Sequence, residues 1–192
     1  MRDVLKSNTG YYPNIKDPEN IRNLYIGHNN INNVDFSPFI NLESLDIGHN
    51  NITDISSLPI SLKWLCIADN PITNFDRITE LVNLKTLWAH QTKINIDNWP
   101  QLNHLLLDDC ELTTIDSLKN LPLKTLELKN NKICSIDVIY NMSLTFLNIC
   151  NNNVKDLGPI SFMGSLKKLN VKNNPIQDYS PIKTLNLRRL SL

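Results

Sequence analysis

The chain has 192 residues, with 19 lysines and arginines against 19 aspartates and glutamates, so its formal net charge at pH 7 is zero. A neutral chain lacks the excess positive charge that draws proteins to nucleic acid or to anionic membranes, and we expect neither as a partner. Its hydrophobic content of 41% is enough for one folded unit with a sizeable core.

Targeting and cysteine signals point to one compartment. The first ten residues, MRDVLKSNTG, lack the apolar run of a signal peptide, and no stretch approaches the roughly 18 uninterrupted apolar residues of a membrane span. We therefore expect a soluble cytoplasmic protein. The cysteines form no C-x-x-C pair and show no zinc-ligand spacing, so we expect reduced thiols, no metal and no cofactor. These cysteines are Cys66, Cys110, Cys134 and Cys150.

The first 20 residues differ from the rest of the chain. They hold a degenerate half repeat followed by YYPNIKDPEN, whose aromatic residues and prolines could cover an apolar end. We expect residues 1–20 to form an N-terminal cap on the repeated part of the chain, which covers residues 21–192.

From residue 21 onward one pattern recurs, L-x-x-L-x-L-x-x-N-x-I, and it is clearest in LKTLELKNNKI at residues 123–133. The intervals between successive repeats are 18 to 22 residues, and such a period is typical of a solenoid. We expect about nine repeats, the last of them truncated. Their first apolar positions are Ile21, Leu42, Leu62, Leu84, Leu102, Leu123, Leu144, Leu166 and Leu187.

Each part of the repeat has a physical role. The alternation x-L-x-L-x predicts a strand that sends its leucines inward and the residues between them outward. The asparagine after each strand is expected to bind backbone groups of neighbouring turns and so to form a buried ladder. The second apolar pair fills the core, and a brief turn or single 3-10 turn closes the coil. We expect this turn to begin with an N-cap at Ser37, Asp76, Asp116, Asp137 or Ser180.

Two places depart from this pattern. The repeat at residues 84–101 is short, and Thr92 and then Cys110 stand where asparagine is expected. The last repeat offers a strand, with Leu190 and Leu192, but no sequence that reads as a C-terminal cap. A solenoid end without a polar cap exposes apolar surface, so the chain could continue in a longer parent protein, the last strand could be covered by another molecule, or it could fray.

The repeats resemble the short class of leucine-rich repeats, about 22 residues long, found in internalins and in phosphatase-regulatory leucine-rich-repeat proteins. The resemblance implies an α/β repeat solenoid, mostly β, that is right-handed and curved. Its parallel sheet would form the concave face, and turns or 3-10 segments the convex face. It also implies protein–protein interaction, in some relatives the regulation of a phosphatase catalytic subunit and in bacterial relatives the binding of a host receptor. The missing signal peptide speaks against a surface internalin but permits a host-interaction module of the effector or viral kind.

The outward strand side chains do not pack in the core, so we expect a binding site to be formed by these positions. Three adjacent repeats bring two tryptophans, two histidines, a cysteine and a leucine to this surface, a combination typical of interface hot spots. The alternative is that the tryptophans pack on one another and shield the sheet. The candidate partner-binding residues are Trp64, Cys66, Trp88, His90, His104, Leu106, Asp108, Phe146, Lys168 and Arg189.

Two chemical alternatives are weaker. Cys66, His90 and Asp108 combine the residue types of a thiol nucleophile, its base and an orienting acid, but they lie on an open face without an oxyanion hole. His28 and His49, from the repeated GHNN, are expected to stack at one slot, and two imidazoles without a third ligand make a weak metal site. We therefore expect no enzyme and no metal.

The sequence favours a monomeric scaffold that recognises another protein on its concave face. The alternative from a different class is a structural assembly component, which would associate end to end through the uncapped C-terminal strand. Neither the partner nor any regulatory role can be read from the residues.

Overall fold

The computed structural model describes residues 15–94 and 98–192, and it divides the chain into two compact units, residues 1–100 (unit 1) and 101–192 (unit 2). The predicted cap at residues 1–20 lies mostly outside the described residues. Of that stretch the structure describes residues 15–20, which include the 3-10 helix η1 (Pro18–Asn20). Within the described part of the chain, no helix is long and apolar enough to cross a membrane.

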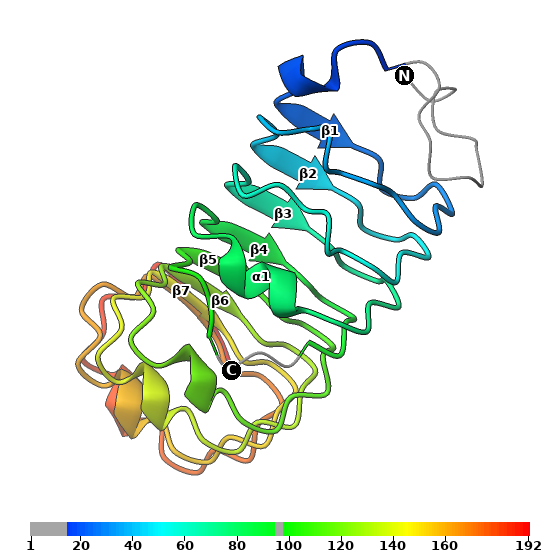
Figure 1. The fold of residues 1–192 in the computed structure, drawn as a ribbon. Helices are drawn as coiled ribbons and strands as arrows, with labels where there is room; N and C mark the ends of the chain where they lie inside the picture. The colour runs from blue at the N-terminus through cyan, green and yellow to red at the C-terminus, as the bar shows by residue number, and fades with distance from the viewer. Residues whose placement is uncertain (1–14, 95–97) are drawn as a thin grey trace. The chain divides into compact units, whose positions relative to one another are not determined.

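Unit 1 carries four short parallel strands, each paired in register with the next (Figure 1). Its one α-helix among the described residues, α1 (Asp76–Glu80), lies between the third and fourth strands in the sequence. The strands are β1 (Asn23–Tyr25), β2 (Ser44–Asp46), β3 (Trp64–Cys66) and β4 (Thr86–Trp88).

Unit 2 repeats the arrangement with five parallel strands and four 3-10 turns. The strands are β5 (His104–Leu106), β6 (Thr125–Glu127), β7 (Phe146–Asn148), β8 (Lys168–Asn170) and β9 (Arg189–Ser191). The turns are η2 (Asp116–Leu118), η3 (Asp137–Ile139), η4 (Gly158–Ile160) and η5 (Ser180–Ile182).

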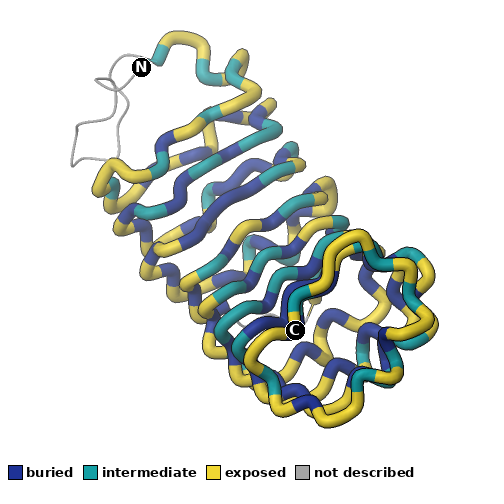
Figure 2. Tube along the Cα trace, turned by 180° about the vertical axis from the view of Figure 1, so that it is seen from behind, coloured by how far each residue is buried: buried dark blue, intermediate teal, exposed yellow. Residues whose placement is uncertain are grey.

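The middle residue of each strand is the leucine that the repeat pattern sends inward. Leu45, Leu65 and Leu126 have no solvent exposure, and buried and exposed residues alternate around each coil (Figure 2). Burying one such side chain contributes about 1.5–3 kcal/mol, so the repeated leucines set the register of the strands. The predicted fold class, a mostly β leucine-rich-repeat solenoid, is confirmed.

The predicted asparagine ladder is present. The side-chain amide of Asn50 donates hydrogen bonds to the carbonyl oxygens of Ile26, Ile47 and Gly48 at 3.0, 2.9 and 3.2 Å. Its oxygen accepts the N–H groups of Asn29 and Ile31, both at 3.0 Å. One buried side chain therefore joins two successive coils and leaves no polar atom of its own unsatisfied.

Opposite the strands, unit 2 has the predicted 3-10 segments, whereas unit 1 has non-helical turns and the α-helix α1. In both units the capping residues lie two positions earlier than expected. The backbone N–H of Ser180 donates to the carboxylate of Asp178 at 2.8 Å, and that of Asp76 donates to the side chain of Asn74 at 2.8 Å. The prediction was wrong here because these side chains close a local i to i+2 turn before the helical residues begin.

Candidate functional site

The outward strand positions of unit 1 form two parallel rows. In-register pairing aligns Tyr25, Asp46, Cys66 and Trp88 in one row and places Trp64 in the neighbouring row, opposite Ser44 and Thr86. The sequence predicted both rows, because a parallel sheet with equal strand lengths puts equivalent repeat positions side by side.

Three aromatic side chains meet on this surface and are referred to below as the aromatic cluster: Tyr25, Trp64 and Trp88. The rings of Trp64 and Trp88 lie 5.1 Å apart at 70°, and those of Tyr25 and Trp64 lie 6.3 Å apart at 64°. Both pairs have the edge-to-face geometry that aromatic rings favour. The tryptophans do pack on one another, as the alternative interpretation expected, yet 37% of Trp88 and 64% of Tyr25 remain exposed.

Tyr25 was not among the predicted site residues. It occupies the same repeat position as Trp88, and that equivalence was the signal available in the sequence. Its ring contacts Trp64 across strand β2, which supplies only the smaller side chains Ser44 and Asp46 to this face. The cluster thus takes its residues from β1, β3 and β4 and bridges β2.

Cys66 differs from its expected role as a contact residue. Only 5% of the residue is exposed, because the bulky rings beside it and the tight glycine positions of the neighbouring strand enclose the thiol. Burial, and secondarily the Asp46 carboxylate, raises the pKa of the Cys66 thiol to about 12. The thiol therefore stays protonated at neutral pH and is a poor nucleophile, which removes the basis of the Cys66, His90 and Asp108 alternative.

Beyond the strands, a row of histidines forms one rim of this face. The imidazoles of His28 and His49 stack at 4.1 Å and 13°, as the repeated GHNN predicts. His49 Nδ1 lies 2.9 Å from a carboxylate oxygen of Asp69, and the ring of His90 lies 6.0 Å from that of His49. Among the described residues, no group of three potential ligands could hold a metal ion.

On the side where the chain enters the strands, unit 1 carries a paired cluster of charges. Glu43 accepts hydrogen bonds from Arg22 at 2.7 Å and from Lys63 at 2.9 Å. The hydrogen bond from Lys63 is the largest cause of the lowered pKa of Glu43. The carboxylate of Glu43 is thus matched within the chain, and the residue precedes β2 and does not belong to the two outward rows.

The outward face of unit 2 has a different chemistry. His104 is exposed, Leu106 is half-buried, and Arg189 extends into solvent on β9. The Nζ of Lys168 lies 6.0 Å from the centre of the Phe146 ring, within reach of a cation–π interaction. The ring of Phe146 on the outward face of this unit therefore already has a cation of the same chain beside it.

Asp108 is the most perturbed carboxyl group of unit 2. Burial raises its pKa to about 6, against the opposing effect of the Lys129 N–H, which donates to it at 2.7 Å. The nearby Glu127 and Asp109 raise the pKa further. A partner that brings a positive charge to Asp108 would meet a group that is partly protonated just below neutral pH.

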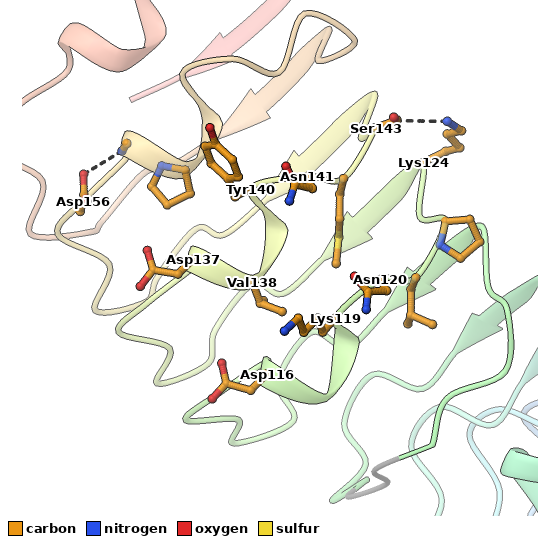
Figure 3. Close-up of a pocket in the computed structure, with 15 residues that line it drawn as sticks. Asp116, Lys119, Asn120, Lys124, Asp137, Val138, Tyr140, Asn141, Ser143 and Asp156 are labelled. Atoms are coloured by element: carbon orange, nitrogen blue, oxygen red, sulfur yellow. Dashed lines mark hydrogen bonds between the residues drawn. The ribbon is translucent and has the colours of Figure 1, made fainter.

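A groove on the turn side of unit 2 was not predicted. Its cavity volume is about 1070 Å³, and Figure 3 shows Asp116, Asp137 and Asp156 along one side and Lys124 on the other. Tyr140 lines the groove, and its ring lies 6.5 Å from that of Phe162, which is 82% exposed. The repeat pattern marked Asp116 and Asp137 only as capping residues, and the rest of the lining comes from turn residues that vary between repeats.

Comparisons with known proteins agree with this architecture. Residues 19–59 and 143–184 match the family model described as leucine-rich repeats (2 copies). No curated protein sequence matches the chain. The crystal structure of internalin C2 from Listeria monocytogenes is similar with a TM-score of 0.85 and 27% identity, over 91% of this chain and 82% of that one.

Two further Listeria monocytogenes structures are similar over 85% of this chain at 27% identity. Internalin F gives a TM-score of 0.79 over 52% of its length. The functional domain of InlJ, which includes a cysteine ladder, gives 0.74 over 37% of its length.

Proposed function

Because this chain is a leucine-rich-repeat protein that resembles the internalins, we propose that it is a non-catalytic scaffold that binds a partner protein through the outward sheet face of unit 1. The observation that supports this proposal most strongly is the aromatic cluster. Rigid repeat solenoids bind through extended sheet surfaces of this kind.

The energetics favour the cluster as the anchor of an interface. Tryptophan and tyrosine are enriched among interface hot spots, where the loss of one such side chain costs about 2 kcal/mol or more of binding free energy. Here the edge-to-face contacts fix the rings before binding, so little side-chain entropy remains to be lost when a partner docks.

The remaining predicted contacts have supporting roles in this proposal. His90 belongs to the histidine rim of unit 1. On unit 2, His104, Leu106, Asp108, Phe146, Lys168 and Arg189 are proposed as a second contact surface. A cytoplasmic location and a regulatory or host-interaction role also remain proposals.

The test is a pull-down with the purified chain as bait, followed by a direct binding measurement with each purified protein that is retained. The Trp64→Ala, Trp88→Ala double variant should lose the partner, with affinity lowered about 100-fold or more. The matched control is Tyr140→Ala, Phe162→Ala, which removes an exposed aromatic pair from the turn side of unit 2. If both double variants bind like the native chain, the proposal is wrong.

A second candidate function is end-to-end assembly through strand β9. Leu190 is 42% exposed and Leu192 57% exposed, whereas the equivalent Leu169 of β8 is 1% exposed. Assembly predicts a mass that grows with concentration in sedimentation experiments and returns to one chain in a Leu190→Gln, Leu192→Gln variant. A monomer at all concentrations would reject it.

A further inference from the structure

Asp46 is the one acidic residue on the described strands β1 to β4, and it sits at the centre of their outward face. It lies in the same row as Tyr25 and Trp88, between Tyr25 of β1 and Cys66 of β3. The rings of Tyr25 and Trp64 meet across β2, the strand that carries Asp46, so this residue lies within the span of the aromatic cluster. Its carboxylate is turned toward Gly27 and Gly48.

The geometry of β2 fixes the carboxylate in place. One oxygen of Asp46 accepts the backbone N–H of Gly48 at 2.9 Å. A Cβ atom at Gly27 or at Gly48 would lie 3.2 Å from the same oxygen, so both glycines leave the space that the carboxylate occupies. A backbone hydrogen bond therefore fixes the Asp46 carboxylate close to the sheet, where the two glycines have no side chain to displace it.

Among the described residues, no cation forms an ion pair with Asp46. Within residues 15–94 and 98–192 the ion pairs of unit 1 involve Glu43, Asp69 and Glu80, and none involves Asp46. Over the same residues, no lysine or arginine side chain lies over the ring of Trp64 or Trp88. On unit 2, by contrast, Lys168 already covers Phe146.

A carboxylate beside exposed indole and phenol rings is the combination that recognises organic cations. The faces of tryptophan and tyrosine attract a positive charge through the ring quadrupole, and a carboxylate adds a charge-assisted hydrogen bond to an ammonium or guanidinium group. We propose that Asp46 and the aromatic cluster together receive a lysine or arginine side chain of the partner protein. This inference rests on the proposed function and names the chemistry of the partner's anchor.

The experiment measures the anchor interaction without any partner. The probes are N-acetyl-lysine methylamide and N-acetyl-arginine methylamide, with N-acetyl-norleucine methylamide as the uncharged probe of similar length. The readout is the NMR shift of the indole N–H groups of Trp64 and Trp88 on titration. Both cationic probes should give saturable shifts, and the norleucine probe should bind about tenfold more weakly or not at all.

Two variants separate a local contact from general electrostatics. Asp46→Asn keeps an acceptor for the Gly48 N–H and should weaken binding of both cationic probes by about fivefold to tenfold. Glu43→Gln removes the same charge just before the same strand, from a residue outside the two outward rows that already pairs with Arg22 and Lys63, and it should leave binding unchanged. Equal binding of all three probes, or an unchanged affinity in Asp46→Asn, would overturn the inference.

The outcomes distinguish this inference from the proposed function. A partner captured through the tryptophans but retained by Asp46→Asn, together with absent probe binding, rejects the cation anchor alone. Saturable probe binding that Asp46→Asn weakens, together with no captured protein, supports the anchor and rejects the scaffold proposal.

Discussion

Asn131 shows how much a single side chain contributes to this fold. Its amide nitrogen donates to the carbonyl oxygens of Leu107, Leu128 and Lys129, and its oxygen accepts the N–H groups of Cys110 and Leu112. All five bonds go to backbone groups, and the residue is only 7% exposed. A smaller side chain cannot replace these bonds, and water has little access to restore them.

We therefore predict that Asn131→Ala lowers the free energy of unfolding by about 3 kcal/mol or more, because each buried polar group left without a partner costs about 1–3 kcal/mol. Urea denaturation followed by far-UV circular dichroism measures this change. The control is Asn141→Ala at an exposed position of the same unit, where a change within about 0.5 kcal/mol is expected. Equal effects of the two variants would contradict a buried ladder.

The pKa of Asp108 links stability to pH. Its value of about 6 lies above the ordinary 3.8, so the folded chain binds this proton more tightly than the unfolded chain does. Well below pH 3.8 both states are protonated and the carboxyl group costs nothing, and stability is lost as pH rises from about 3.8 through about 6.

Asp108→Asn should therefore raise the free energy of unfolding at pH 8 by about 1 kcal/mol and have little effect at pH 4. The modest size reflects solvent screening of a half-buried group. Urea melts of both proteins at the two pH values measure the difference. A gain that is the same at pH 4 and pH 8 would show that the carboxyl group is not the cause.

At the scale of the element, the exit from each strand uses a left-handed backbone. The residue before the ladder position has a positive φ in eight successive repeats, with values from 49° to 59°. These residues are His28, His49, Asp69, Gln91, Asp109, Asn130, Asn151 and Asn173. Asparagine, aspartate and histidine are enriched in this conformation. This explains the recurring segments GHNN and KNN, in which the His, or the first Asn of KNN, is the left-handed residue and the Asn after it is the ladder residue.

Gln91 is the residue least suited to this conformation, with φ at 55°. We predict that Gln91→Gly raises the free energy of unfolding by about 0.5–1 kcal/mol, because glycine adopts positive φ without steric cost. Gln91→Val, which is β-branched, should lower it. Thermal unfolding of both variants tests the assignment, which fails if valine is tolerated as well as glycine.

The strands could be predicted because the alternating leucines need only a buried position on one side of the sheet. Trp64 and Trp88 could likewise be placed on the outward face, since a parallel register preserves the repeat position. The burial of Cys66 and the contact of Tyr25 with Trp64 could not, because they depend on side-chain size in neighbouring strands. The capping by Asp178 was not predicted because several polar residues near the turn could each cap it, and the sequence does not show which of them does.

At the scale of the whole molecule, the division into two units has a convenient spectroscopic consequence. The chain has three tryptophans, and all of them, Trp64, Trp88 and Trp99, belong to unit 1. Indole fluorescence therefore reports on unit 1, whereas far-UV circular dichroism reports on both units. In repeat proteins, stability is a sum of repeat and neighbour terms, so a local defect need not spread through the chain.

We predict that Asn131→Ala, which weakens unit 2, moves the circular dichroism midpoint to lower urea but leaves the fluorescence midpoint unchanged. The native chain measured by both probes provides the reference. If fluorescence and circular dichroism move together in the variant, the two units unfold as one cooperative body.

The side chains of the left-handed residues of unit 2 also form a row of hydrogen bonds from repeat to repeat. Asn173 donates to Asn151, Asn151 to Asn130, and Asn130 to Asp109, each across a separation of 21 or 22 residues. The two hydrogen bonds between asparagines use the same donor, Nδ2, and the same acceptor, Oδ1, so these repeats are equivalent in this row. A gene duplication that copied the stretch from Asn130 to Cys150 would insert a coil whose amide finds an identical partner on either side. In this row, the molecule can therefore gain whole repeats by duplication without needing a new kind of hydrogen bond.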